Sequence, residues 1–347
     1  MPDVEVSPVV RSVLAAAFPE REVAAAGDAG PSWNDGNRTI GVEFADGDRA
    51  YCKVAVDGDP SRAARECGVL AYVDANVTVP VPTVLASATD DAADPPYVVT
   101  ADVDGTIGWR AWRDADDDDR AAFARAVGRT FAAVHDQRFD DHGRVVGGDA
   151  RELHVDPEPW PALLADQIRW SRDRADGGRF DDHYDDVLAL VDDERDALRD
   201  APAALCHGDP ARPNQFLHDA HSSDIVHDAH SSDTAERAPT VGLLDWELAH
   251  VGDPVRELQR TRRQFVDSRY DPGTERHARA FYDGYRERAG GLPDGFEDRR
   301  AIYDAVTYLG VTGFFEKWAD DFDEPTDELA AEVDAEMDRR LAVARER

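Results

Sequence analysis

The spacing of apolar residues along the chain changes once, near residue 118. Before that point, apolar residues alternate with polar ones or form short runs of β-branched and aromatic residues, which is typical of strands. RTIGVEF at 38–44 and RAYCKVAV at 49–56 flank the turn ADGD and predict a β-hairpin. The segment 24–37, rich in Gly, Asn and Ser, is predicted to be a loop. The same part of the chain predicts two helices and two further strands, at 8–18, 60–75, 79–90 and 95–105.

Beyond residue 118 the apolar residues follow the period of a helix. Phe123, Val127, Phe131 and Val134 recur at spacings of four and three, which places them on one helix face directed at a core. Similar stripes predict further helices at 158–174, 183–199, 254–266, 274–289, 297–319 and 326–345. The first part of the chain therefore mixes strands and helices, and the second part is mostly α-helical.

Composition and charge narrow the functional classes. The chain has 347 residues, 42% of them apolar, which is enough for one large two-part domain or two ordinary ones. It carries 39 basic and 73 acidic residues, and the formal charge of −34 argues against binding to nucleic acid or to an anionic membrane. The acidic residues are spread through every segment, and only Lys53 and Lys317 are lysines, which suits a protein kept soluble at very high salt. At molar salt the Debye length is about 3 Å, so the net charge does not predict the charge of a ligand.

Cysteine usage and the N-terminal residues bear on the compartment. Cys52, Cys67 and Cys206 are widely spaced without a CxxC, which argues against a disulfide framework and fits a reducing interior. MPDVEVSPVVRSVL lacks the basic start and apolar core of a signal peptide, and nowhere do 18 apolar residues run together. We expect a cytoplasmic protein with no membrane segment and no obligate protein partner.

The candidate chemistry lies in two short motifs. His207, Gly208 and Asp209 are followed by Asn214, and the apolar strand VGLL then leads to Asp245 in LLDWE. Oxygen-bearing side chains at strand ends and in a tight loop can hold a hard cation such as Mg²⁺, which takes few protein ligands. The spacing HGDxxxxN, followed by an apolar strand that ends in Asp, is much more informative than an isolated HxD.

With these motifs the chain resembles the aminoglycoside phosphotransferase and choline kinase-like family, over nearly its whole length. The resemblance implies an α+β, protein kinase-like, two-lobed fold: a small N-terminal lobe at 1–102 with an antiparallel sheet and one main helix, and a larger, mostly α-helical lobe at 103–347. It also implies that Asp209 is the catalytic base and that Asn214 and Asp245 are the Mg²⁺ ligands. LCHGDPARPNQFL departs from the commoner family wording just before the Asn.

The N-terminal part supplies the residues that such an enzyme needs for its nucleotide. Lys53 lies in an apolar strand of a chain that has almost no other lysine, and Glu66 is the one acidic residue between Pro60 and Asp74 on the next helix. We expect an ion pair between them that orients the lysine toward phosphates. By resemblance, Gly30, Ser32 and Asn34 belong to the loop that covers the phosphates. The backbone at Ala101 and Val103 would pair with the adenine edge.

Each of these residues also has a structural explanation when it is taken alone. A strand lysine is more often an edge residue whose ammonium reaches water, and Glu66 could be an ordinary surface charge. His207 fits a hydrogen-bond partner that orders the loop. Asp253 before Pro254 has the form of a helix N-cap. The acceptor-pocket candidates are Trp109, Trp112, Trp160, Trp170 and Asp267. Tryptophans at helical spacing are more often core residues.

The segment 218–239 contains HDAHSSD twice, from His218 and again from His227. HxxH pairs can bind Zn²⁺ or Ni²⁺, but the segment has no cysteine and no helical pattern. Its Asp, Ser and His residues are typical of loops, and it lacks the apolar residues needed to bury itself. We interpret it as a duplicated turn inserted between the catalytic loop and the strand that leads to Asp245.

The predicted function is ATP-dependent or GTP-dependent phosphoryl transfer, with Mg²⁺, to a hydroxyl group of a small molecule. It rests on six signature residues taken together: Gly30, Lys53, Glu66, Asp209, Asn214 and Asp245. One alternative is a kinase-like module that binds nucleotide without turnover. A second is a protein kinase, against which the helix-rich region 118–200 and the lack of an APE sequence after LLDWE both argue. The pattern of residues does not identify the acceptor.

Overall fold

The computed structural model describes residues 7–29, 36–90, 93–175, 177–218 and 239–346. The chain divides into two compact units. The first contains residues 1–116, 145–155 and 212–249, and the second contains residues 117–144, 156–211 and 250–347. Within the described residues, no helix has the length and apolar character that a membrane crossing requires.

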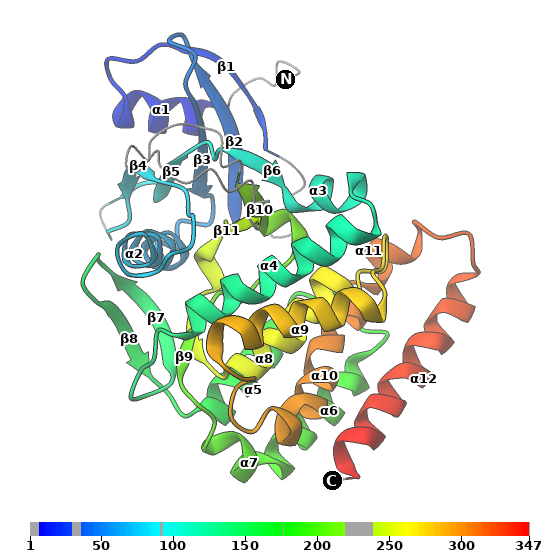
Figure 1. The fold of residues 1–347 in the computed structure, drawn as a ribbon. Helices are drawn as coiled ribbons and strands as arrows, with labels where there is room; N and C mark the ends of the chain where they lie inside the picture. The colour runs from blue at the N-terminus through cyan, green and yellow to red at the C-terminus, as the bar shows by residue number, and fades with distance from the viewer. Residues whose placement is uncertain (1–6, 30–35, 91–92, 176, 219–238, 347) are drawn as a thin grey trace. The chain divides into compact units, whose positions relative to one another are not determined.

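A five-stranded antiparallel sheet is the centre of the first unit (Figure 1). Its strand order is β1-β2-β3-β5-β4. The strands are β1 (Val23–Asp28), β2 (Asn37–Phe44), β3 (Arg49–Ala55), β4 (Val84–Ala88) and β5 (Tyr97–Ala101). Val10, Val13 and Leu14 of helix α1 (Pro8–Ala17) pack against inward-facing residues such as Ile40 and Cys52. This packing buries one face of the sheet and so holds the central strand β3 in place.

Helix α2 (Ser61–Asn76) contacts a β-hairpin whose residues 145–155 belong to the first unit. Gly68 is buried, and a Cβ atom there would come within 2.5 Å of the Gly148 backbone nitrogen, so only glycine permits this approach. The hairpin is formed by β7 (Gly143–Gly148) and β8 (Leu153–Pro157). A three-stranded sheet, β11-β10-β6, completes the unit together with helix α3 (Gly108–Asp114). Its strands are β6 (Gly105–Ile107), β10 (Gln215–His218) and β11 (Thr240–Leu243).

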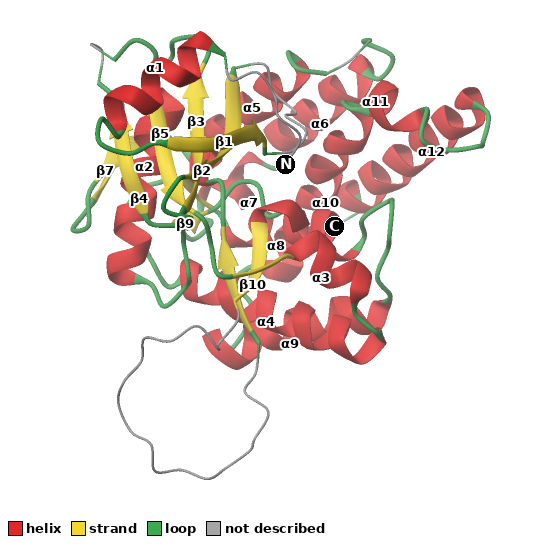
Figure 2. Cartoon of the chain, turned by 90° about the horizontal axis from the view of Figure 1, so that it is seen from above, coloured by secondary structure: helices red, strands yellow, loops and turns green. Residues whose placement is uncertain are grey.

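The second unit is mostly helical (Figure 2). Helices α4 (Asp117–His135) and α9 (Glu275–Ala289) pack closely through glycines, because a Cβ at Gly128 would collide with the Phe281 carbonyl oxygen. Short strands β9 (Ala204–Cys206) and β12 (His250–Gly252) pair antiparallel. The remaining helices are α5 (Trp160–Arg172), α6 (Asp181–Asp193), α7 (Arg195–Arg199), α8 (Pro254–Thr261), α10 (Phe296–Thr312), α11 (Phe315–Ala319) and α12 (Thr326–Arg345).

Several expectations about elements are wrong in detail, and three of them show the physical reasons. Residues 23–28, expected in part as loop, form strand β1. Their alanine-rich sequence has little strand propensity, and the hydrogen bonds to β2 hold the segment as a strand. The strand expected over 95–105 ends at Ala101, and Gly105 then pairs with His218 in a different sheet. The helix expected over 297–319 is interrupted after Thr312, where the Gly313 N–H closes the last turn on Leu309.

All three cysteines are free thiols that the fold withdraws from solvent. Cys52 in β3 and Cys206 in β9 are buried, and Cys67 in α2 is half-buried. Burial raises the pKa of Cys52 to about 12 and that of Cys67 to about 11. Burial likewise raises the pKa of Cys206 well above its usual value. Thiolate, the reactive form, is therefore scarce at all three positions.

Candidate active site

Lys53 is the centre of a charged cluster in the first unit. It lies on β3 with 16% of its side chain exposed, and its Nζ donates to Glu66 Oε2 at 2.8 Å and to Asp245 Oδ1 at 2.6 Å. Glu247 Oε2 lies 3.4 Å away. The expected ion pair between Lys53 and Glu66 is therefore present, and one ammonium group serves three carboxylates.

The pKa values of this cluster reflect its burial and its charges. Burial alone would lower the pKa of Lys53, but Asp245, Glu66 and Glu247 raise it well above its ordinary value, so the ammonium stays charged. Burial raises the pKa of Glu66 to about 7, and the nearby carboxylates add to the rise while Lys53 opposes it. The cluster as a whole carries more negative than positive charge.

Asp245 reaches Lys53 through an unusual backbone conformation. It follows β11 with φ of 63° and ψ of 66°, and it is the one non-glycine residue with positive φ in the described part of the chain. This left-handed conformation is tolerated best by Gly, Asn and Asp. Trp246, which is fully buried, begins the 3₁₀ turn Trp246–Leu248 directly afterwards. Chain direction therefore changes at the residue whose carboxylate faces the lysine.

Glu247 is held by residues from two other elements. Asn37 Nδ2 at the start of β2 donates to Glu247 Oε2 at 2.5 Å, and Arg62 Nη1 lies 3.5 Å from Oε1. Arg65 of α2 donates to the Glu247 carbonyl oxygen at 2.7 Å. These contacts fix α2, and with it Glu66, against the turn that carries Asp245.

Asn214 lies in the same unit, in the 3₁₀ turn Arg212–Asn214 that precedes β10. Its carbonyl oxygen accepts a hydrogen bond of 2.8 Å from the N–H of Leu244, next to Asp245. Arg212, where the sequence departs from the commoner family wording, lies with its guanidinium carbon 4.1 Å from the Trp112 ring centroid. The departure therefore has a packing role in the turn.

The donor atoms around Lys53 suit a hard cation. Carboxylate oxygens of Glu66, Asp245 and Glu247 all lie within 4.8 Å of one another. Asp245 has 37% of its side chain exposed, so its carboxylate can reach a ligand from solvent. Oxygen donors with access to water are what Mg²⁺ prefers. The residues present therefore fit a magnesium ion.

Asp209 lies in the second unit, directly after β9. Gly208 takes a positive φ of 89°, and the Asp209 N–H donates to His207 Nδ1 at 3.1 Å, so His207 orders the loop as expected. Asp209 Oδ1 accepts from Arg260 Nη2 at 3.3 Å and from Gln264 Nε2 at 3.1 Å. With 30% of its side chain exposed, Asp209 is open to solvent and restrained in orientation.

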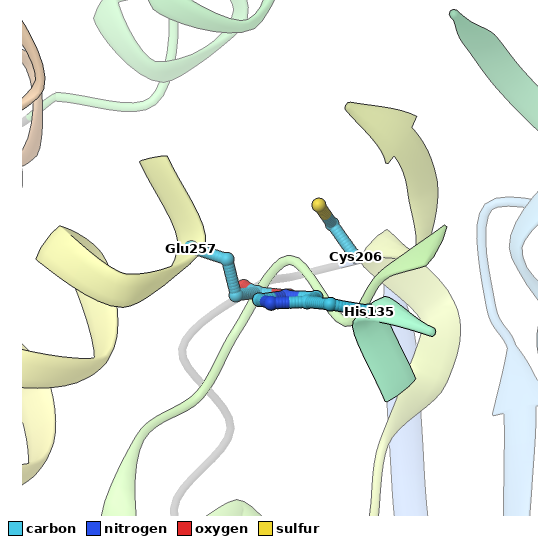
Figure 3. A group of neighbouring side chains, drawn as sticks. All are labelled: His135, Cys206 and Glu257. Atoms are coloured by element: carbon cyan, nitrogen blue, oxygen red, sulfur yellow. The ribbon is translucent and has the colours of Figure 1, made fainter. Parts of the chain in front are cut away.

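A buried carboxylate supports this loop from behind. Glu257 of α8 is 1% exposed and accepts hydrogen bonds from the backbone N–H groups of His207 and Gly208. His135 Nε2 lies 4.0 Å from Glu257 Oε2 (Figure 3). His135 Nδ1 is 3.1 Å from the Tyr285 hydroxyl oxygen. Burial alone would raise the pKa of Glu257, but the neighbouring histidines bring it down to about 2.

His135, Cys206 and Glu257 also have potential ligand atoms within 4.8 Å of one another (Figure 3). The Glu257 oxygens, however, already accept backbone hydrogen bonds, and burial keeps the Cys206 thiol protonated. A metal would need both groups as free anions. The cluster is therefore arranged as a hydrogen-bonded support for the loop.

Two expected adenine contacts have backbone partners in the first unit. The Ala101 N–H donates to the Thr83 carbonyl oxygen at 2.9 Å, and the Val103 N–H donates to the Asp102 side chain at 3.0 Å. Their role toward a nucleotide stays a prediction. Gly30, Ser32, Asn34 and most of the repeated segment 218–239 lie outside the described residues.

The acceptor-pocket candidates divide between core and surface. Trp112 and Trp160 are fully buried, and Trp160 Nε1 donates to the Tyr303 hydroxyl oxygen at 2.7 Å. Trp109 is 41% exposed and Trp170 is 39% exposed. Asp267 is paired with Arg262 at 3.1 Å. Asp253 caps α8 through Val255, as expected, and also binds Arg299.

The sequence analysis missed several residues of both clusters. Glu247 follows Asp245 by two positions, and Glu257 follows Asp253 by four. This spacing is the signal that could have pointed to them. Nothing in the sequence links Asn37 or Arg62 to Glu247, because the contacts join distant segments. The other missed residues are Arg260 and Gln264, which touch Asp209.

Comparison with known proteins places this arrangement in a family. Residues 33–300 match the model of the phosphotransferase enzyme family. No curated protein matches the chain. The chain is similar in structure to a Thermobifida fusca protein described as a candidate fructosamine-3-kinase, with 21% identity, a TM-score of 0.60, and coverage of 96% of this chain and 99% of the other.

Two further solved structures are also similar to this chain. Macrolide 2'-phosphotransferase MphH from Brachybacterium faecium has 17% identity and a TM-score of 0.53, with coverage of 93% of this chain and 97% of that one. APH(2'')-IIa, solved with streptomycin and ATP, has 10% identity and a TM-score of 0.57, with 97% of each chain covered. At these identities the likeness concerns the fold, and it confirms the expected α+β, kinase-like class. With the family model matching most of its length, the chain belongs to the phosphotransferase enzyme family.

Proposed function

We propose that the protein transfers the γ-phosphoryl group of ATP to a hydroxyl group of a small molecule, with Mg²⁺. The observation that carries this proposal is the contact of Lys53 with both Glu66 and Asp245, in a chain that belongs to a phosphotransferase family. Lysine paired to a helix glutamate is the arrangement that binds α- and β-phosphates in kinases. A similar structure was solved with ATP bound, which supports this nucleotide.

Asn214 and Asp245 would hold the Mg²⁺, with Glu247 beside them. A bound Mg²⁺ would offset phosphate charge that the surplus of carboxylates around Lys53 otherwise repels. Gly30, Ser32 and Asn34 would cover the phosphates, and the backbone at Ala101 and Val103 would meet the adenine. We also propose a functional division into a nucleotide-binding part, 1–102, and a catalytic and acceptor-binding part, 103–347.

Asp209 would align the acceptor hydroxyl and take its proton. The acceptor oxygen forms a bond to the γ-phosphorus, the bond from that phosphorus to the ADP oxygen breaks, and the hydroxyl proton passes to Asp209. Arg260 and Gln264 support this role because both hold Oδ1 of the carboxylate. Positioning supplies most of the rate enhancement in such a reaction.

Replacement of Asp209 by Asn tests the proposal. Asp209→Asn keeps the size of the side chain but removes the base, so acceptor-dependent ADP release should fall by about 10²- to 10⁴-fold while ATP binding is retained. Asp298→Asn, at an exposed position in the first turn of α10, is the matched control. Turnover in Asp209→Asn equal to that of the wild type would contradict the assignment.

Nucleotide binding without ADP release, across a panel of hydroxylated small molecules, would instead favour a silent nucleotide-binding module. Thermal unfolding with Mg²⁺ and either ATP or GTP would identify the preferred nucleotide, because the tighter ligand raises the midpoint more at equal concentration. A protein kinase would phosphorylate polypeptide substrates and leave the small-molecule panel unchanged.

A further inference from the structure

A run of arginines follows the N-cap of α8. Four of the eight residues from Arg256 to Arg263 are arginine and one is glutamate, in a protein whose formal charge is −34. The run continues from α8 into a π-helical turn, Arg262–Val266. π-helical turns are rare and often occur at functional sites. The local excess of positive charge therefore needs its own explanation.

Two of the four arginines have structural partners. Arg262 binds Asp267 and Glu275, each at 3.1 Å. Arg263 donates to the Asp267 carbonyl oxygen at 2.9 Å and lies 5.5 Å from the Tyr308 ring centroid. Both contribute to the packing of the turn.

Arg256 has no such partner. It is 7% exposed, its Nε makes no hydrogen bond, and no carboxylate among the described residues lies within 4.0 Å of its guanidinium. The adjacent Glu257 directs its carboxylate to the backbone of His207 and Gly208 instead. Burial, followed by the positive charge of Arg260, lowers the pKa of Arg256 to about 10. A buried guanidinium without a carboxylate is costly, and a second one beside it adds repulsion.

Arg260 connects this buried charge to Asp209. Its Nη2 is 3.3 Å from Asp209 Oδ1, its side chain is 26% exposed, and its buried Nε has no hydrogen-bond partner among the described residues. Gln264 donates to the same Oδ1 at 3.1 Å, while its buried Oε1 has no partner in the same described part of the chain. Arg256, Arg260 and Gln264 are spaced four residues apart, which places them on one side of the helix. Each has a buried polar atom without a hydrogen-bond partner among the described residues.

We infer that Arg256 and Arg260 form an anion-binding subsite, and that the phosphate acceptor is a hydroxy compound that carries a carboxylate or a phosphate group. The inference rests on the proposed role of Asp209. Guanidinium groups bind both kinds of anion with paired hydrogen bonds. Because Arg260 touches Asp209, the anionic group lies only a few bonds from the reacting hydroxyl, and it stays unchanged in the transfer. A cationic amino sugar would meet charge of its own sign.

The subsite is tested first by binding, with no nucleotide present. Inorganic phosphate is titrated into the protein at constant ionic strength, and its affinity is measured by calorimetry and by the midpoint of thermal unfolding. Arg260→Gln should weaken phosphate binding by about tenfold or more, because it removes one charged donor pair. Arg260→Lys should retain part of the affinity.

Arg300→Gln is the control, because Arg300 is exposed and pairs with Glu297 of its own helix. If phosphate does not bind to the wild-type protein, or binds Arg260→Gln as tightly, the inference is overturned. Arg260 is the primary variant because it is partly exposed, whereas a change at the buried Arg256 could prevent folding.

Acceptors matched in size then show which group Arg260 binds during turnover: an anionic group on the acceptor or the phosphoryl group that is transferred. Glycerate, glycerol and 3-aminopropane-1,2-diol differ in charge, and ADP release is compared with that of Asp209→Asn. A preference for glycerate that Arg260→Gln removes through a higher KM supports the inference. An equal loss in kcat for all three would assign Arg260 to the transferred phosphoryl group and overturn it.

These outcomes are distinct from a failure of the proposed function. Asp209-dependent turnover that favours glycerol or the amine would overturn the anionic acceptor and leave the phosphotransferase proposal intact. If none of the three compounds gives Asp209-dependent ADP release, that result counts against the proposed function. The phosphate titration with Arg260→Gln decides the subsite in that case.

Discussion

Lys53 is the one cation that contacts all three carboxylates of Glu66, Asp245 and Glu247 among the described residues, so its removal has consequences for stability as well as for binding. Lys53→Met would leave Glu66 and Glu247 buried with no ammonium group nearby. Breaking a buried ion pair from one side is strongly destabilising, and we expect a loss of about 3 kcal/mol in the free energy of unfolding. Mg²⁺ should restore part of this loss, because a divalent cation can replace the missing charge.

The measurement is chemical denaturation with and without MgCl₂. Lys317→Met is a matched control, because Lys317 is the other lysine of the chain and is exposed. Equal stability of Lys53→Met and the wild-type protein would contradict the expectation, and so would a Mg²⁺ effect no larger than that seen in Lys317→Met.

Glu257 should make stability depend on acid pH. Its pKa is lowered from 4.5 to about 2 in the folded protein, so the folded state binds a proton less readily than the unfolded state. The stabilisation from Glu257 is therefore fully present at pH values above the pKa of the unfolded state, 4.5. It is lost as the pH falls from about 4.5 toward 2. A shift of this size corresponds to about 3 kcal/mol.

The stability difference between the wild type and Glu257→Gln should therefore be large at neutral pH and shrink in acid. Glu297→Gln, exposed in the first turn of α10, should show little difference at either pH. Denaturant titrations at a series of pH values measure the difference. A gap between wild type and Glu257→Gln that widens toward acid would reverse the sign and refute the explanation.

Individual contacts were predictable only where a motif fixed both partners. Lys53 and Glu66 could be paired from the sequence, because the strand has a single lysine and Glu66 is the single acidic residue between Pro60 and Asp74. Glu247 and Glu257 stand two residues after Asp245 and four residues after Asp253, but this spacing does not identify the partner of either carboxylate. Their partners, Asn37 and the backbone of His207, are far away in sequence.

At the scale of elements, the pairing of α4 with α9 depends on two glycines. A Cβ at Gly284 would collide with the Arg125 carbonyl oxygen, just as one at Gly128 would collide with Phe281. Gly128→Ala should lower the free energy of unfolding by about 1–3 kcal/mol, because the helices must separate to admit a methyl group.

Gly310→Ala is the control for helix propensity. Gly310 lies in α10 with open space around the position of its missing Cβ, so alanine should stabilise the helix by about 0.5–1 kcal/mol. Thermal and denaturant unfolding of the two variants should therefore move in opposite directions. A shift of the same sign in both would argue against tight packing at Gly128.

Helices and strands with a regular spacing of apolar residues were predicted well. Strands that form because a neighbouring strand or helix lies beside them were not. The stripe around Phe131 marked α4, and the alternation in 38–56 marked the β2–β3 hairpin. Strand β1 has few β-branched residues and exists because β2 lies beside it. The β7–β8 hairpin, rich in glycine, gave no clear alternation, and its contact with Gly68 of α2 is visible only in three dimensions.

For the whole molecule, the surplus of acidic side chains should make stability depend on salt. The 73 acidic residues outnumber the 39 basic ones, so mutual repulsion opposes the compact state at low ionic strength. Added KCl screens that repulsion, and the midpoint of thermal unfolding should rise from low to molar concentrations. Sucrose at the same water activity is the control, because it is excluded from the protein surface but does not screen charge. A midpoint that rises equally in sucrose, or falls in KCl, would contradict adaptation to high salt.

Because its three natural thiols are protonated and buried or half-buried, the protein is suited to site-directed labelling at added cysteines. A new cysteine at Val56 in the first unit, which is 54% exposed, or at Val343 in the second, which is 46% exposed, would present an accessible sulfur. Maleimide dyes react with thiolate and would modify these positions ahead of Cys52, Cys67 and Cys206. A donor and acceptor fluorophore could thus be attached without first deleting any natural cysteine, and energy transfer between them would follow the two units through a catalytic cycle.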